Sequence, residues 1–157
     1  MKIFISHKQE DNAYALGVKQ VLDNCKVNAY LDVLDNEISE NGDELTEHIK
    51  SKLRECTDVI VILSEKTRES WWVPFEIGMA SEKDIPIANY LISGIKLPEY
   101  LEFWPRLKNQ NDVLKYVTVR KKVSESRREK FIYESSSLYS AESETKEFYR
   151  KLKQELR

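Results

Sequence analysis

The stretch "DVIVILS", residues 58–64, is almost continuously apolar and decides the fold class. Such a run is typical of a central strand, because the side chains on both of its faces are then buried. Similar apolar runs predict four more strands on either side of it: "KIFIS" (2–6), "VNAYLDV" (27–33), "IPIANYLI" (85–92) and "VLKYVTV" (113–119). The fold is therefore expected to be built around one sheet.

Helical spacing separates these strands. Apolar residues recur at intervals of three and four in two segments, which contain Tyr14, Val18, Val21, Leu22 and Cys25 in the first and Leu45, Ile49, Leu53 and Cys56 in the second. Alternation of strand and helix predicts an α/β fold with a parallel sheet and helices on both faces. The crossover connections of such a sheet are expected to be right-handed.

The carboxyl-terminal part of the chain is less regular. We expect one or two short helices between residues 94 and 112 and a core that spans 2–119. Residues 120–140 are charged and serine-rich, which predicts an insertion or surface loop with at most partial helix. A last amphipathic helix is expected over 141–156, with Ser140 as its N-cap. The absence of a linker or repeat predicts a single domain over 1–157.

Composition gives little sign of a polyanionic partner. Of the 157 residues, 33% are charged, but 25 basic and 27 acidic side chains leave a net charge of −2. We therefore expect no nucleic-acid and no membrane binding. The start of the chain has no signal-peptide pattern, and Cys25 and Cys56 are isolated, which is typical of reduced thiols in a cytoplasmic protein.

Several kinds of active site lack their sequence patterns here. The four glycines form no phosphate-binding motif, and no serine stands in a nucleophile-elbow motif. The two histidines, His7 and His48, are not in metal-ligand spacing with the cysteines. We expect no bound metal and no resident cofactor.

The ends of the predicted strands supply the candidate ligand site, because open α/β sheets bind ligands beyond the carboxyl ends of their strands. The side chains at those ends are Ser6, His7, Lys8, Asp32 and Ser64. Together they offer hydroxyls, a cation and a carboxylate. This combination favours a nucleotide-like ligand.

The segment "ESWWVPFEIGMA", residues 69–80, adds an acid inside an apolar run. Pro74 is tolerated only near a helix start, so the helix is expected to begin between Ser70 and Val73. Trp72 and Glu76 are four residues apart and share one face of that helix, whereas Trp71 does not. Two interpretations stay open: a working carboxylate beside an aromatic wall, or an exposed Glu76 and a packing Trp72.

These residues also carry a resemblance to a known family. "KIFISHKQED" resembles the first signature of Toll/interleukin-1 receptor (TIR) domains, and "YLDVLDNEISENGDELTEHIKSKL" resembles their second strand, BB loop and following helix. "DVIVILSEKTRESWWVPFE" is similar to the third strand and the W-x-x-x-E pattern of NAD-cleaving members. Trp72 and Glu76 occupy the two positions of that pattern. The chain departs from the family in a longer loop at 34–40 and in residues 120–140.

The resemblance implies a flavodoxin-like fold with a five-stranded parallel sheet in the order 2-1-3-4-5. It implies cleavage of the nicotinamide–ribose bond of NAD+, with Glu76 as the catalytic glutamate. The residues that would bind the substrate are Ser6, His7, Lys8, Asp32 and Trp72. The products would be ADP-ribose, a cyclic ADP-ribose isomer or a conjugate.

Stand-alone bacterial TIR proteins of this size resemble the NAD-cleaving component of Thoeris-like anti-phage defence. That likeness implies self-association through TIR–TIR contacts and a separate effector protein reached through a nucleotide signal. Two alternatives remain. One is a non-catalytic TIR interaction module of the adaptor kind, and the other is an enzyme similar to nucleoside deoxyribosyltransferases.

Overall fold

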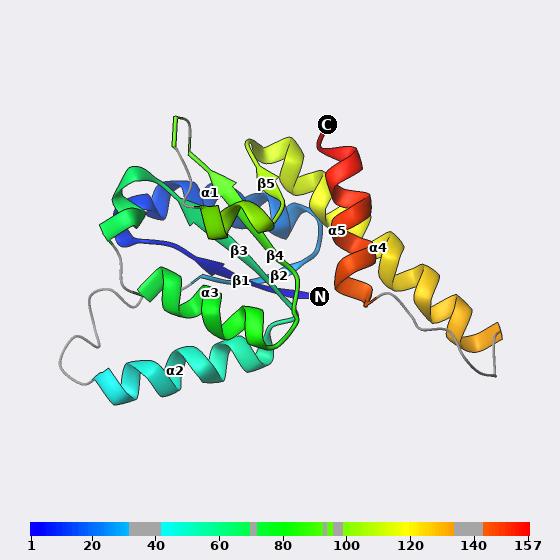
Figure 1. Ribbon diagram of the computed structural model, residues 1–157, viewed down its shortest axis with the longest axis horizontal. Helices are drawn as coiled ribbons and strands as arrows, with labels where there is room; N and C mark the ends of the chain where they lie inside the picture. Colours follow the sequence, from blue (N-terminus) through cyan, green and yellow to red (C-terminus); the bar gives the residue numbers. More distant parts are fainter. Residues whose placement is uncertain (32–41, 70–71, 93, 96–98, 134–142) are drawn as a thin grey trace.

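A five-stranded parallel sheet forms the centre of the protein (Figure 1). The computed structural model describes residues 1–31, 42–69, 72–92, 94–95, 99–133 and 143–157. The strands are β1 (Lys2–Ser6), β2 (Asn28–Leu31), β3 (Asp58–Leu63), β4 (Ile87–Leu91) and β5 (Arg106–Leu107). Their order is β2-β1-β3-β4-β5, so the predicted α/β, flavodoxin-like fold and strand order are confirmed.

The strand β3 is central and buried at every residue, as its apolar sequence predicts. Ile60 pairs with Ile5 of β1 on one side and with Ala88 of β4 on the other. Its alternate side chains contribute to two separate hydrophobic clusters, one on each face of the sheet. The predicted strands 2–6, 27–33 and 85–92 each contain an observed strand.

Helices cover both faces of the sheet. On one face lie α1 (Asn12–Asn24), α4 (Gln110–Tyr133) and α5 (Glu144–Glu155), and on the other lie α2 (Gly42–Glu55) and α3 (Trp72–Glu82). Short 3-10 helices, η1 (Gln9–Asp11), η2 (Glu65–Glu69) and η3 (Glu99–Phe103), lie in the connections. The predicted apolar positions Leu45, Ile49 and Leu53 of α2 are buried, and so is Cys56, one residue beyond its end.

In α1 one member of the predicted apolar face is exposed. Ala15, Val18 and Leu22 are fully or almost fully buried, whereas 49% of Tyr14 is accessible to solvent. The buried stripe runs through positions 15, 18 and 22, which share a helical face that position 14 borders. Tyr14 therefore contributes to the surface and not to the core.

The prediction of a strand at 113–119 is wrong, because these residues lie within α4. Val113, Tyr116 and Val117 are buried, at the helical spacing of three and four. The β-branched residues suggested a strand, but Asn109 accepts a hydrogen bond from the backbone N–H of Asp112 and caps a helix start. The fifth strand is instead the two residues Arg106 and Leu107.

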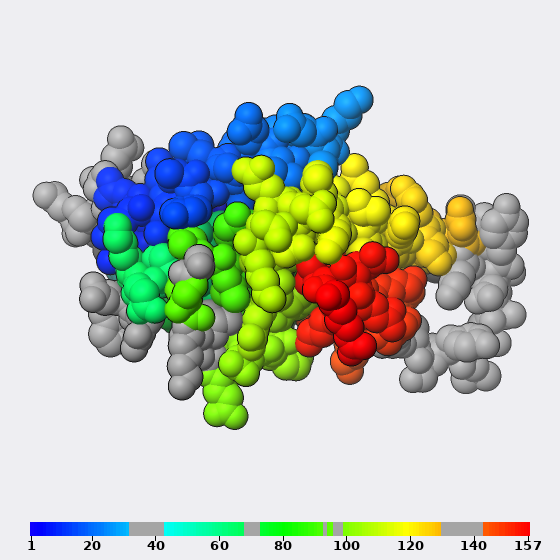
Figure 2. Space-filling model, turned by 90° about the horizontal axis from the view of Figure 1, so that it is seen from above, coloured from blue at the N-terminus to red at the C-terminus, as the bar shows by residue number. Residues whose placement is uncertain are grey.

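Residues 120–133 continue α4, so the expectation of a loop is wrong for this part of 120–140, whereas the expectation of partial helix holds. Residues 134–140 lie outside the described part. The last helix begins at Glu144, and its N-cap is Ser143, whose side chain accepts a hydrogen bond from the backbone N–H of Lys146. Figure 2 shows α5 (red) beside α4 (yellow), and the two helices pack through the rings of Tyr116 and Phe148.

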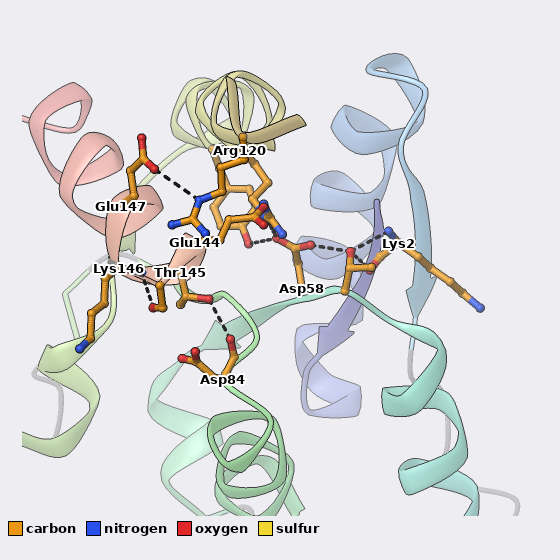
Figure 3. A network of polar contacts seen from close by, with 12 residues as sticks. Lys2, Asp58, Asp84, Arg120, Glu144, Thr145, Lys146 and Glu147 are labelled. Atoms are coloured by element: carbon orange, nitrogen blue, oxygen red, sulfur yellow. Dashed lines mark hydrogen bonds and ion pairs between the residues drawn. The ribbon is translucent and has the colours of Figure 1, made fainter. Parts of the chain in front are cut away.

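A buried polar cluster ties α4 and α5 to the amino end of β3 (Figure 3). Nε of Arg120 lies 2.9 Å from Oδ1 of Asp58, and the Tyr116 hydroxyl donates to the same oxygen at 2.9 Å. Arg120 also pairs with Glu144 of α5. This cluster lies at the edge of the sheet opposite the carboxyl ends of the strands, so it supports the fold without entering the candidate site.

Candidate functional site

A hydrogen bond joins the end of β1 to the helix α3. The hydroxyl of Ser6 donates to Oε2 of Glu76, although the two residues are 70 positions apart. Ser6 is completely buried and only 2% of Glu76 is exposed. The structure therefore brings together two of the residues that the sequence analysis placed in the site.

Glu76 lies on the buried face of α3. Val73, Ile77 and Ala80 of the same helix are buried against the sheet, and Glu76 stands among them at the spacing of that face. The interpretation that the helix turns Glu76 to solvent is therefore wrong. A carboxylate taken out of water in this way costs stability, which makes it a candidate for function.

The helix α3 begins at Trp72, within the predicted range. Pro74 is therefore in the first turn, where its missing N–H has no helical acceptor to lose. The side chain of Trp72 lies outside the described part of the structure, as does Asp32. The placement of both side chains in the site stays a prediction.

The two residues after Ser6 have different surroundings. His7 is 8% exposed, and its Nδ1 is buried without a hydrogen-bond partner among the described residues. Nζ of Lys8 lies 3.3 Å from Oε1 of Glu10, and the side chain of Lys8 is 22% exposed. Lys8 is thus held beside a carboxylate at the same edge of the sheet, while Nδ1 of His7 finds no hydrogen-bond partner in the described part of the chain.

Asp11 is a buried residue that the sequence analysis did not select. It is 3% exposed, and its Oδ2 accepts hydrogen bonds from the hydroxyls of Ser64 at 2.6 Å and Thr67 at 3.3 Å. The Ser64 hydroxyl also accepts from the backbone N–H of Lys66 at 3.1 Å. This cluster joins the loop after β1 to the loop after β3. The sign of this residue in the sequence is its position, since Asp11 is an acidic residue five positions after the end of the first predicted strand.

A separate groove of about 520 Å³ lies between α2 and α3. Its lining includes Leu53, Phe75 and Met79, with the charged side chains of Lys50 and Arg54 beside them. None of the predicted site residues is among the residues that line it.

A metal-binding cluster and a membrane-spanning helix are both absent from the described residues. No three His, Cys, Asp or Glu side chains gather closely enough there to hold a metal ion. No helix in the described ranges combines the length and apolar character needed to span a bilayer. The chemistry on offer at the sheet edge is that of a buried carboxylate with an oriented hydroxyl donor.

Comparison with known proteins gives a family match over most of the chain. A family model described as TIR domain matches residues 3–132. No curated protein matches the sequence. The solved structures that resemble it include the TIR domain of the Toll-related receptor TRR-2 from Hydra magnipapillata. That match has a TM-score of 0.59 and 14% identity, and covers 80% of this chain and 97% of the other.

A second similar structure is a 2-deoxyribosyltransferase from Bacillus psychrosaccharolyticus. Its TM-score is 0.60 at 14% identity, over 72% of this chain and 90% of that protein. At such identities both structures establish a shared fold and nothing about activity.

Proposed function

The chain belongs to the TIR domain family, and from this premise we propose that it cleaves the bond between nicotinamide and ribose in NAD+. One observation carries the proposal. The acid of the W-x-x-x-E pattern, Glu76, is withdrawn from water onto the buried face of α3 and accepts a hydrogen bond from Ser6. A glutamate with a purely solvating role would be exposed.

The chemistry needs few groups. Nicotinamide leaves NAD+ as a neutral base from a cationic ring, so the leaving group needs no strong acid. The developing oxocarbenium ion is stabilised by a nearby carboxylate, which also orients the ribose hydroxyls. This is the role proposed for Glu76. Only 2% of Glu76 is exposed, so substrate binding has to open this edge of the sheet.

Other residues are proposed to bind the dinucleotide. Nδ1 of His7, which has no hydrogen-bond partner among the described residues, and the ammonium of Lys8 lie directly after β1, at the edge where α/β sheets bind ligands. Asp32 and Trp72 are assigned to substrate binding from their positions in the sequence motifs. An indole face stacked on a flat cation stabilises it by about 0.5–2 kcal/mol.

The nucleophile that captures the ribosyl group decides the product. Water gives ADP-ribose, and an adenine or ribose atom of the same molecule gives a cyclic isomer. We propose that the product is a signal in bacterial anti-phage immunity that activates a separate effector protein. The free thiols of Cys25 and Cys56 are compatible with a cytoplasmic location. Self-association through TIR–TIR contacts is part of the same proposal.

The decisive experiment is mass spectrometry of the products formed from NAD+ by the full chain, over a range of protein concentrations. Glu76→Ala should abolish nicotinamide release while circular dichroism shows an unchanged fold. Glu76→Gln, which keeps the size and the hydrogen-bond acceptor, should be equally inactive. Full turnover by either variant would refute the assignment of Glu76.

Two alternatives predict different results. The likeness to a 2-deoxyribosyltransferase makes a deoxynucleoside the second substrate to test, and release of free base from it but not from NAD+ would favour that class. A non-catalytic interaction module would release no base from either substrate. It would still self-associate in sedimentation experiments.

A further inference from the structure

We propose that Ser6 is a positioning residue that holds the Glu76 carboxylate in its working orientation, and that it does not contact the substrate. The inference rests on the proposed function for its kinetic consequences. Its structural basis is the hydrogen bond from the Ser6 hydroxyl to Oε2 of Glu76. The strand-end rule and the family resemblance predict instead that Ser6 binds the substrate.

Both side chains are buried, since Ser6 has no exposed surface and Glu76 has 2%. The serine hydroxyl is directed at Oε2 of Glu76. A hydroxyl has one donor hydrogen, and here it is committed to the carboxylate, which leaves none for a hydrogen bond to substrate.

The backbone of β1 fixes the direction of the Ser6 side chain. Side chains of a strand alternate between faces, so Ser6 points to the same face as Phe4. Phe4 packs in the cluster formed with α2 and α3, which contains Val73 and Ile77. Ser6 also pairs with Val61 of β3, so its position is held from the neighbouring strand. A donor on this rigid element restricts a glutamate that has three rotatable bonds.

This contact has two physical consequences. A hydrogen bond from a neutral donor to a carboxylate is stronger than one between neutral groups, and it favours the ionised acid. It also fixes the plane of the carboxylate relative to the sheet. Loss of the hydroxyl should therefore lower the rate of the chemical step and make protonation of Glu76 easier, with little effect on substrate affinity.

The kinetic test compares Ser6→Ala and Ser6→Cys with the unaltered chain, using nicotinamide release from NAD+. We expect Ser6→Ala to lower kcat about ten-fold or more and to change KM less than about two-fold. Ser6→Cys, which has nearly the same shape and a weak donor, should recover part of the loss. The acidic limb of the pH–rate profile should move to higher pH by about one unit in Ser6→Ala.

Ser81→Ala is the matched control, because Ser81 is on the same helix as Glu76 but is exposed. It should leave kcat, KM and the pH profile unchanged. A rise in KM at constant kcat in Ser6→Ala would overturn the inference, since it would place Ser6 in direct contact with substrate. An unchanged kcat and pH profile would overturn it as well.

A second measurement is independent of the reaction. In protein labelled with ¹³C at the glutamate carboxyl carbons, the Glu76 signal is identified by its loss in Glu76→Gln. We expect its titration midpoint to be higher in Ser6→Ala than in the unaltered chain and in Ser81→Ala. Equal midpoints would refute the positioning role. If the unaltered chain does not cleave NAD+, the proposed function is refuted. The positioning role of Ser6 is still tested in that case, because the titration of Glu76 does not depend on the reaction.

Discussion

The Ser64 hydroxyl donates a 2.6 Å hydrogen bond to Oδ2 of Asp11, which joins the loop after β1 to the loop after β3. Thr67 donates to the same oxygen at 3.3 Å. Hydrogen bonds to a buried carboxylate stabilise more than neutral ones. The two loops border the strand and helix that carry Ser6 and Glu76, so this cluster holds the frame of the candidate site.

Asp11→Ala should lower the free energy of unfolding by about 2–3 kcal/mol, because two buried hydroxyls lose a charged acceptor. Urea denaturation followed by circular dichroism measures this change. Glu10→Ala is the control, since Glu10 is adjacent but exposed, and it should change stability by less than about 0.5 kcal/mol. Similar effects of the two substitutions would contradict a structural role for the Asp11 cluster.

Arg120→Met should destabilise the protein by about 3–5 kcal/mol at neutral pH, because it leaves the carboxylate of Asp58 buried without its counter-charge. Arg106→Met removes an exposed arginine that pairs only with Glu102 among the described residues, so its effect should be within about 1 kcal/mol. Urea denaturation of both variants provides the comparison.

The cost of Arg120→Met should also depend on pH. Burial raises the pKa of the Asp58 carboxyl above 3.8, although the Arg120 guanidinium and the Thr57 and Tyr116 hydroxyls oppose the shift. A raised pKa gives a contribution to stability that is present below 3.8 and lost as pH rises through the folded-state value. Loss of Arg120 removes a group that opposes the raised pKa, so stability should fall more steeply with pH in the variant. The free energies of unfolding of the variant and the unaltered protein should therefore be closest near pH 4. A loss of unfolding free energy that is the same at every pH would contradict this expectation.

Ionisation of the Tyr149 hydroxyl should lower the stability of the protein at high pH. Burial raises the pKa of this hydroxyl from 10.0 to about 12. The hydroxyl oxygen also accepts a 2.8 Å hydrogen bond from the backbone N–H of Ile87, and this contact acts to lower the pKa. The contribution is fully present below pH 10 and is lost as pH rises from 10 through 12. At most about 2.7 kcal/mol is involved, from two pKa units.

Unfolding measured between pH 9 and 12 should therefore show a shallower decline in Tyr149→Phe than in the unaltered chain. Tyr100→Phe is the control, because 56% of Tyr100 is exposed, and its decline should match that of the unaltered chain. If Tyr149→Phe declines just as steeply, ionisation of Tyr149 does not limit stability at alkaline pH.

Glu76→Gln should raise the free energy of unfolding by about 1 kcal/mol or more while it abolishes activity. The amide oxygen still accepts the Ser6 hydrogen bond, but no charge has to be buried in the apolar face of α3. Gains in stability at the cost of function are expected at active sites. Glu82→Gln, at the exposed end of α3, should have almost no effect. Destabilisation by Glu76→Gln would indicate a structural role for the carboxylate.

Trp72→Ala should change the ratio of ADP-ribose to cyclic products as well as the rate, since an aromatic wall governs which nucleophile reaches the ribosyl cation. Trp71→Ala is the sequence-matched control, because its spacing places it off the face of Glu76. Chromatography of the products from NAD+ measures the ratio. The same product ratio in Trp72→Ala as in the unaltered chain would show that Trp72 only packs.

Much of the architecture followed from local pattern. The uninterrupted apolar run of β3 required a strand buried on both faces, and Leu45, Ile49 and Leu53 marked the buried face of α2. Motif resemblance supplied the strand order. These features were predictable because hydrophobic periodicity reports burial directly.

The residues from 106 to 119 were not predictable in this way. A strand of two residues, Arg106 and Leu107, has no period of its own and exists through its pairing with Asn89 and Tyr90. The valines of α4 have strand propensity, but the helix cap at Asn109 and packing against α1 and the sheet override it.

By itself, the sequence determined the fold class, the start of α3 and the spacing that puts Trp72 and Glu76 on one helical face. Only the tertiary structure decided that Glu76 is buried, that Ser6 donates to it, and that Asp11 joins two loops. Helical spacing defines a face but not what covers it. Burial and long-range hydrogen bonds depend on which strand ends the sheet brings beside that face, and Ser6 is 70 residues away from Glu76 along the chain.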